Sequence, residues 1–299
     1  MKKIGVLLLF FILLLSIAAC GRNAENIDFE QDDETLIVTS FYPMYIFTGN
    51  IAANIEGVKV VNMTEPQTGC LHDYQLVPAD LKVLEKADIF VINGAGMESF
   101  LEKVISQLPD LTIIEAAKDM DLLVDGSGEE NPHVWVSISG AIQEVKNITE
   151  GLIAADPKNE ASYRKNSEEY VKKLENLKNS MHEALKDIKT KDIVTFHEAF
   201  PYFAHEFGLN IVSVIEREPG SEPSAGELAD TIKAINDAQT KVIFAEPQYS
   251  AKAAESIAAQ TGAEIYVLDP VVTGPKVAEL DSYEKTMEEN LETLIEALK

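Results

Sequence analysis

Short apolar runs alternate with longer amphipathic segments along most of this chain. The runs are rich in valine and isoleucine, which favour buried strands. The segments between them carry apolar residues at the three- and four-residue spacing of a helix. Eight runs are predicted to be strands: residues 36–40, 58–63, 89–93, 111–114, 192–196, 210–214, 241–245 and 264–268.

Helices are predicted between these strands. Ser224 stands three residues before Glu227, which is the spacing of a capping box at the start of a helix. Alternating strands and helices predict an α/β fold in which parallel sheets are covered by helices on both faces. The predicted helices are residues 78–86, 97–107, 137–155, 199–207, 227–238, 251–261 and 283–298.

A different pattern begins at Asp156. From there to Ile188 the chain has one proline, near its start, and no glycine, and its apolar residues recur at spacings of 7, 4, 3, 4, 4 and 3. This predicts a helix of about 33 residues, roughly 50 Å long. A coiled-coil dimer is one interpretation of such a stripe. We favour a rigid connector between two lobes, because the stripe holds only about four heptads and its flanks are globular.

The first residues have the architecture of an export signal. Lys2 and Lys3 precede an apolar run over residues 4–15, and small residues then lead to Cys20. A helix needs about 20 apolar residues to span a bilayer, so this run is too short. Residues 17–20, Ile-Ala-Ala-Cys, resemble the lipobox of bacterial lipoproteins. That resemblance implies cleavage before Cys20 and lipidation of its thiol.

These patterns predict a two-lobed α/β organisation with parallel sheets. A lipoprotein signal peptide over residues 1–19 and an acidic tether over residues 20–35 come first. The rest is an N-terminal α/β lobe over residues 36–155, the connecting helix over residues 156–189 and a C-terminal α/β lobe over residues 190–299.

Charge and cysteine content exclude several classes of protein. The chain has 25 Lys+Arg against 50 Asp+Glu, a formal net charge of −25. Nucleic-acid binding and polybasic contact with anionic lipid both need a basic surface, so we exclude them. The two cysteines are too few for a disulfide framework, and lipidation of Cys20 would leave Cys70 as the only thiol.

Three of the five histidines lie where a ligand site is expected. His197 directly follows one predicted strand and Asp269 follows another. The carboxyl ends of parallel strands are where α/β folds bind ligands. His72 and His133 lie in loops that can reach the same crevice. Three imidazoles and one carboxylate form a complete tetrahedral set for a metal ion such as Zn²⁺.

Five segments carry a resemblance to a known family. They are residues 69–80 (GCLHDYQLVPAD), 131–137 (NPHVWVS), 197–204 (HEAFPYFA), 219–228 (PGSEPSAGEL) and 268–270 (LDP). Together with the lipobox, and in this order, they resemble the zinc/manganese solute-binding lipoproteins of bacterial metal ABC importers (the cluster A-I or cluster 9 family). The resemblance runs from about residue 36 to the C-terminus.

The resemblance implies a fold, a function and a place in the cell. The fold has two lobes joined by one long helix, with a metal ion in the crevice between them. The protein would be a monomer that captures the ion outside the cytoplasm and delivers it to an ABC permease. The lipid on Cys20 would anchor it to the cell membrane.

The metal ligands follow from the same resemblance. In the family the third ligand is histidine in zinc members and glutamate in manganese members, so this chain favours Zn²⁺, with Mn²⁺ as the alternative. The implied ligands are His72, His133, His197 and Asp269.

Four further residues are weighed as possible members of this site. Cys70 is interpreted as an inert buried thiol, with a soft auxiliary ligand as the alternative. Glu246, at the end of a predicted strand, is a competing carboxylate, ranked below Asp269 as a supporting or interface group. His182 and His205 are expected to lie outside the site.

Two other functions are weighed against metal transport. A metalloenzyme usually keeps three protein ligands and a water on its zinc, and no H-E-x-x-H sequence occurs in this chain. A surface adhesin is a role given to some such lipoproteins, but no adhesive repeat supports it here. We therefore expect a metal-binding protein rather than an enzyme.

Overall fold

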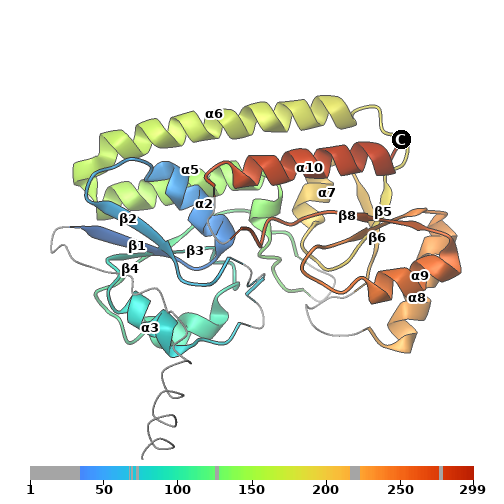
Figure 1. Cartoon of the computed structure of the whole chain (residues 1–299), viewed down its shortest axis with the longest axis horizontal. Helices are drawn as coiled ribbons and strands as arrows, with labels where there is room; N and C mark the ends of the chain where they lie inside the picture. The colour runs from blue at the N-terminus through green and yellow to red at the C-terminus, as the bar shows by residue number, and fades with distance from the viewer. Residues whose placement is uncertain are drawn as a thin grey trace, which may run out of the picture. The chain divides into compact units, whose positions relative to one another are not determined.

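The computed structural model describes residues 34–66, 68, 70–71, 74–124, 128–215, 223–275 and 279–299 (Figure 1). The predicted signal peptide, Cys20 and His72 lie outside these residues, as does nearly all of the predicted tether. Among the helices described, none is both long enough and apolar enough to cross a membrane.

Two four-stranded parallel sheets form the framework, which confirms the predicted two-lobed α/β fold. The first has the order β2-β1-β3-β4 and the second β6-β5-β7-β8. All eight predicted strands are present, with ends that differ by about one residue. Their bounds are β1 Thr35–Thr39, β2 Val58–Asn62, β3 Ile89–Ile92, β4 Thr112–Glu115, β5 Asp192–Thr195, β6 Asn210–Val214, β7 Val242–Ala245 and β8 Glu264–Val267.

Each sheet has a point at which the strand order reverses. In the second sheet the chain leaves β5 for β6 on one side and returns to β7 on the other, so β5 and β7 are neighbours. Loops leaving their carboxyl ends turn to opposite sides and open a crevice, where α/β sheets bind ligands. His197 lies two residues beyond β5 and Glu246 directly follows β7.

Apart from α6, described below, the helices agree with the predicted ranges to within about two residues except in two places. No helix is predicted over α2, because nearly all its positions are buried and it lacks a polar face. Residues 97–107 form a 3-10 turn and a short helix instead of one helix, since Gly94, Ala95 and Gly96 all have positive φ and delay its start. The α-helices are α2 Tyr42–Ile51, α3 Pro78–Leu84, α4 Glu102–Ile105, α5 Ile138–Ala155, α6 Glu160–Leu185, α7 Pro201–Phe207, α8 Ala225–Ala238, α9 Lys252–Thr261 and α10 Ser282–Ala297, and the 3-10 turns are η1 Ser99–Leu101, η2 Val134–Val136 and η3 Pro157–Asn159.

The start of α8 has the capping box that the sequence predicts. The Ser224 hydroxyl accepts a hydrogen bond from the Glu227 amide at 3.3 Å, and the Glu227 carboxylate accepts one from the Ser224 amide at 2.8 Å. These bonds satisfy amide groups that have no partner within the helix.

Helix α6 has 26 residues, fewer than the roughly 33 predicted, because residues 157–159 form the 3-10 turn η3 and the helix ends at Leu185. One face is buried along its length, and it packs against both α5 and α10 (Figure 1). Its apolar stripe is therefore used inside this chain, and it is not available as the seam of a coiled-coil dimer. The buried residues of the stripe are Tyr163, Ser167, Tyr170, Leu174, Leu177, Met181 and Leu185.

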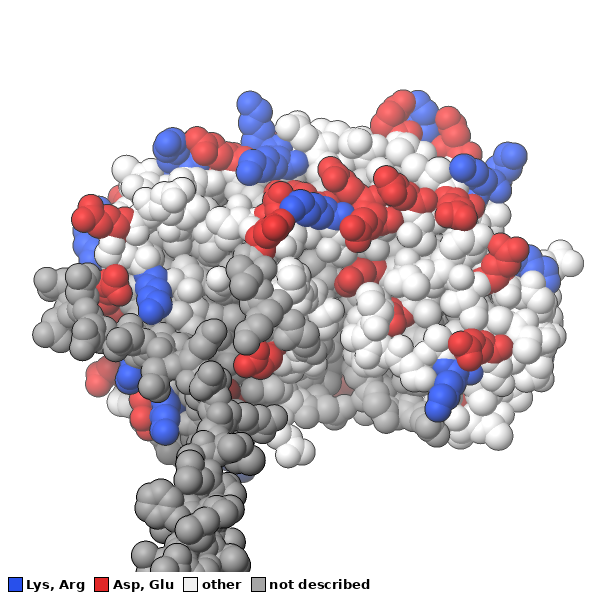
Figure 2. Space-filling view, viewed as in Figure 1, with Lys and Arg blue, Asp and Glu red and all other residues white. Residues whose placement is uncertain are grey.

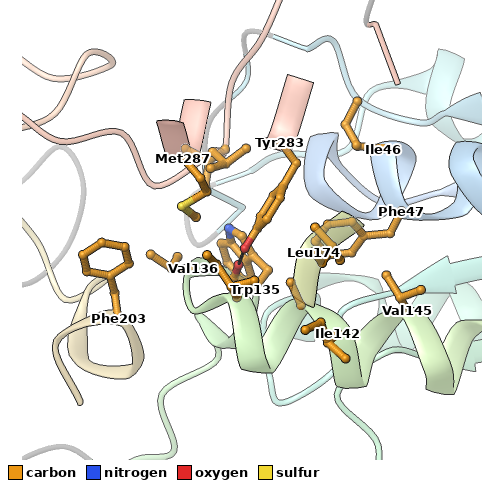
Figure 3. Close-up of a cluster of buried hydrophobic side chains, with 14 of the residues drawn as sticks. Ile46, Phe47, Trp135, Val136, Ile142, Val145, Leu174, Phe203, Tyr283 and Met287 are labelled. Carbon is orange, nitrogen blue, oxygen red and sulfur yellow. Dashed lines mark hydrogen bonds between the residues drawn. The ribbon is translucent and has the colours of Figure 1, made fainter. Parts of the chain in front are cut away.

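The last helix returns to the first half of the chain. α10 contacts α6 and α2 as well as β8. In the core, Tyr283 of α10 lies edge-on to Phe47 of α2, with ring centroids 5.2 Å apart. Its hydroxyl donates a hydrogen bond to the Trp135 carbonyl at 2.8 Å. Figure 3 shows this cluster, which also contains Phe203 of α7. One continuous core thus joins elements from both lobes.

Acidic side chains gather along α10 (Figure 2). Glu288, Glu289, Glu292 and Glu296 are exposed on this helix. The net negative charge therefore lies on the surface, where it raises the local concentration of cations.

Candidate metal centre

His133 is held by a loop asparagine. The side-chain oxygen of Asn131 accepts hydrogen bonds from the His133 amide at 2.9 Å and from its ring Nδ1 at 3.0 Å. The Asn131 amide nitrogen donates to the Glu198 carbonyl at 2.8 Å, so the oxygen is the atom that faces His133. These bonds place the ring hydrogen on Nδ1 and leave Nε2 as the atom that can bind a metal.

His197 is held by a carboxylate from the neighbouring strand. Its Nδ1 lies 2.6 Å from Oε1 of Glu246, and the exposed fractions of the two side chains are 1% and 0%. The other carboxylate oxygen accepts a hydrogen bond from the Gln248 side chain at 2.8 Å. Because β5 and β7 are paired in parallel, the residues that follow them meet at one edge of the sheet. Metal-binding histidines usually have such a partner on their other nitrogen.

Their surroundings shift the pKa values of His197 and Asp269. Burial lowers the pKa of His197, but the Glu246 carboxylate and Cys70 outweigh it and raise that pKa to about 10. Burial, with a smaller contribution from the charge of Glu246, raises the pKa of Asp269 to about 6, although the hydrogen bond that its carboxylate accepts from the Val271 amide lowers this pKa. In the metal-free protein His197 is therefore protonated at neutral pH, and a metal ion must displace that proton.

Cys70 lies between the two histidines. Its sulfur is 3.7 Å from Nε2 of His133 and 3.7 Å from Nε2 of His197. The ligand atoms of these three residues all lie within 4.8 Å of one another. In the part of the chain that the structure describes, no other group of three or more metal-ligating side chains is as close. The two rings meet edge to face, with centroids 5.2 Å apart.

Of the four predicted ligands, the structure brings two together. His133 and His197 share the cluster, and both are buried, with exposed fractions of 3% and 1%. Asp269 does not belong to the close group; its Oδ1 accepts a hydrogen bond from the Val271 amide at 2.7 Å. His72 lies outside the described residues. Metal ligation by all four stays a prediction.

The segment of Asp269 nevertheless packs beside the cluster. The next residue, Pro270, accepts a hydrogen bond from the Trp135 indole at 2.9 Å. Trp135 is fully buried, and its ring centroid lies 5.2 Å from that of His133. The only tryptophan of the chain therefore contacts one of the two histidines directly.

The remaining histidines have other surroundings. His182 is half-exposed on α6, where its ring contacts Phe207 at a centroid distance of 4.9 Å. His205 is exposed on α7. Neither is in the close group of metal-ligating side chains.

Comparison with known proteins gives the family. The family model described as zinc-uptake complex component A, periplasmic (ZnuA), matches residues 37–297. The chain belongs to the ZnuA family. This confirms the resemblance to the solute-binding proteins of metal ABC importers.

Individual relatives align along most or nearly all of the chain. The high-affinity zinc uptake system protein ZnuA of Bacillus subtilis is 34% identical over 99% of this chain and 98% of its own length. The laminin-binding protein Lmb of Streptococcus agalactiae, described as bifunctional with adhesin and metal-transporting activity, superposes with a TM-score of 0.79 at 29% identity, over 89% of this chain and 100% of that one.

A third relative is longer than this chain. Zn(II)-bound AdcA of Streptococcus pneumoniae superposes with a TM-score of 0.76 at 31% identity, over 89% of this chain but only 58% of AdcA. AdcA is described as a zinc-binding lipoprotein.

Sequence reasoning gives Asn131 no role, and it offers metal ligation by Cys70 only as the alternative to an inert thiol. Asn131 stands two residues before His133. The Asn-Pro-His sequence is the signal that could have suggested an Asx turn, in which the asparagine side chain accepts a hydrogen bond from the histidine amide. Cys70 is interpreted from sequence as an inert thiol, and no local spacing links it to histidines 63 and 127 residues away.

Proposed function

We propose that this protein is an extracytoplasmic, lipid-anchored binding protein that captures Zn²⁺ and delivers it to an ABC permease. One observation carries the proposal: two buried imidazoles meet edge to face, each is held through Nδ1, and both Nε2 atoms lie 3.7 Å from the sulfur of Cys70. Such an arrangement is suited to holding a metal ion.

The chemistry of the site favours zinc over manganese. Zinc binds well to imidazole nitrogen, whereas manganese prefers carboxylate and water oxygen as ligands. The proposed ligands are His72, His133, His197 and Asp269, as the family motifs imply. The relatives described above as zinc uptake and zinc-binding proteins support this choice.

We propose binding without turnover. The family to which the chain belongs is one of transport components. Four protein ligands would leave no open position for a reactive water, which catalytic zinc sites keep. Stoichiometric uptake of the ion, followed by release to the permease, requires no chemistry at the metal.

The direct test is elemental analysis of the purified protein combined with competition between Zn²⁺ and Mn²⁺. We expect one tightly bound zinc per chain, which excess Mn²⁺ does not displace. Purified protein that holds no stoichiometric metal, or that prefers Mn²⁺, would contradict the proposal.

The lipid anchor has its own test. Cys20→Ser should abolish acylation, so that the protein is released from the membrane or stays unprocessed. Fractionation of cells with labelled fatty acid measures this. A Cys20→Ser protein that still carries an acyl chain would exclude Cys20 as the anchor.

A further inference from the structure

We propose that Cys70 is itself a metal ligand, so that the captured ion binds a thiolate together with the imidazoles of His133 and His197. This inference rests on the proposed function, because it places a sulfur ligand in the same site. In a four-coordinate site the thiolate takes the position proposed for Asp269, which does not belong to the close group. Cys70 is then the soft ligand that the sequence offered as an alternative, rather than an inert thiol.

The distances agree with a tetrahedral zinc site. Zn–S and Zn–N bonds of about 2.3 and 2.05 Å at the tetrahedral angle place sulfur and nitrogen about 3.6 Å apart. The sulfur of Cys70 lies 3.7 Å from Nε2 of both histidines. Both sulfur–nitrogen distances therefore match those expected when one zinc ion binds the thiolate and an imidazole.

The orientation of the rings supports the same conclusion. Asn131 and Glu246 hold the Nδ1 atoms of His133 and His197, respectively. The opposite ring atoms, both Nε2, are the ones nearest to Cys70. Two independent supports on different elements thus direct both imidazoles toward one thiol.

Described residues on either side of Cys70 have their own packing and hydrogen bonds. Leu71, the next residue, is fully buried, and its carbonyl accepts a hydrogen bond from the Tyr74 amide at 3.0 Å. On the other side, the Pro66 carbonyl accepts a hydrogen bond from the Gly274 amide at 2.9 Å. These hydrogen bonds hold Pro66 and Leu71, which lie on either side of Cys70 in the sequence.

A sulfur ligand changes the metal preference. Thiolate is a soft ligand that selects zinc, whereas manganese prefers oxygen. The thiol releases its proton to solvent when it binds, since the thiolate is the form that binds metal. We therefore expect Cys70 to increase the preference for Zn²⁺ over Mn²⁺ beyond what histidines alone provide.

The alternative role of Cys70 is a hydrogen bond to the imidazoles in the metal-free protein, which requires no bond to the ion. Co²⁺ separates the two, because a sulfur–cobalt bond produces a charge-transfer absorption in the near ultraviolet that nitrogen and oxygen ligands do not. The full chain carrying Cys20→Ser is used, so that Cys70 is the only thiol present.

Three proteins are titrated with Co²⁺ and Zn²⁺. These are the Cys20→Ser chain, the same chain with Cys70→Ser, and the same chain with Thr68→Ala as a control in the same loop. We expect the sulfur–cobalt band in the first and third proteins and not in the second. In Cys70→Ser the Kd for Zn²⁺ should rise by about tenfold or more, while the Kd for Mn²⁺ changes less.

The outcomes separate this inference from the proposed function. Cobalt binding with visible d–d bands but no sulfur band would overturn ligation by Cys70 and leave metal capture intact. No saturable binding of either ion would contradict metal capture itself. If Cys70→Ser does not fold, X-ray absorption of the zinc-loaded Cys20→Ser chain decides: a sulfur neighbour at about 2.3 Å supports the inference, and a shell of nitrogen and oxygen alone overturns it.

Discussion

Oε1 of Glu246 lies 2.6 Å from Nδ1 of His197, and both side chains are buried. The same carboxylate oxygen also accepts a hydrogen bond from the His197 backbone amide at 3.2 Å. Glu246 therefore sets the direction of the imidazole and makes it a stronger electron donor, which is the usual role of a carboxylate behind a metal-binding histidine.

Removing the charge of Glu246 should weaken metal binding without removing a ligand. In Glu246→Gln we expect the Kd for Zn²⁺ to rise by about 10- to 100-fold. Competition with a chelator measures it. Glu255→Gln, at an exposed position on α9, is the control and should keep the wild-type Kd. An unchanged Kd in Glu246→Gln would show that the contact has no role in binding.

His197 itself should be needed for tight binding. His197→Ala removes an imidazole from the cluster, and we expect the Kd for Zn²⁺ to rise by at least about 100-fold. His197→Glu should narrow the preference for zinc over manganese, because a carboxylate oxygen is harder than an imidazole nitrogen.

The fluorescence of Trp135 gives the titration signal for these variants, since this residue contacts His133 and its emission should change when a metal ion binds. His205→Ala, on the exposed face of α7, is expected to bind like the wild type, and equal affinity in His197→Ala would remove His197 from the site.

Metal binding should release protons at neutral pH. The pKa of His197 is about 10, lowered by burial but raised more by Glu246 and Cys70, so the ring must lose a proton before Nε2 can bind a metal ion. We expect about one proton or more to be released per Zn²⁺ at pH 7.5, and the affinity to fall as the pH falls. Calorimetry in two buffers with different ionisation enthalpies measures the number. An enthalpy that is the same in both buffers would show that no proton is released.

Glu144 should make the metal-free fold less stable as the pH rises. This side chain on α5 is fully buried, and neither carboxylate oxygen has a hydrogen-bond partner among the residues described. Burial raises its pKa well above the ordinary value, and the charge of Glu98 raises it further. The folded state therefore binds this proton more tightly than the unfolded state. Its contribution to stability is complete below the unfolded pKa and is lost as the pH rises toward the folded one.

The comparison is between Glu144→Gln and the wild type. We expect the free energy of unfolding in urea to fall between pH 5.5 and 8.5 in the wild type, and to fall less in Glu144→Gln. Glu150→Gln, on the same helix but exposed, should follow the wild type. A pH dependence that is equal in all three proteins would show that Glu144 does not titrate with unfolding.

Gly274 should not tolerate even a methyl group. A Cβ at this position would lie 1.9 Å from Cζ of Tyr42, whose side chain is buried. We expect Gly274→Ala to lower the free energy of unfolding by about 1–3 kcal/mol, the usual effect of overpacking. Gly226→Ala is the matched control: the nearest atom to its Cβ would be the Ser224 hydroxyl at 3.8 Å, and an added methyl in helix α8 should be neutral or stabilising. Urea denaturation measures both, and equal stability of the two variants would contradict the steric argument.

Local chemistry was sufficient to predict most of the secondary structure. Strands such as β1 and β5 are short apolar runs, and α6 shows its buried face as a helical repeat, so neighbouring residues alone define them. The capping box at Ser224 is likewise contained in four residues. His197 was predicted to lie at a ligand crevice because a histidine directly after a strand is at the edge where α/β sheets bind ligands.

Other features depend on residues far apart in the chain. α2 is buried on nearly all sides, so it has no polar face to reveal it, and α10 packs against α2 and α6 rather than only against its own sheet. Cys70 and His197 are in contact although 127 residues separate them in the sequence, and no periodic pattern in the sequence predicts such a contact. A pattern along the chain reports which face of an element is buried, whereas the partners of a polar side chain are selected when the sheets and helices pack together. The two lobes could therefore be predicted from the order of residues, while the meeting of Cys70, His133 and His197 is a product of packing.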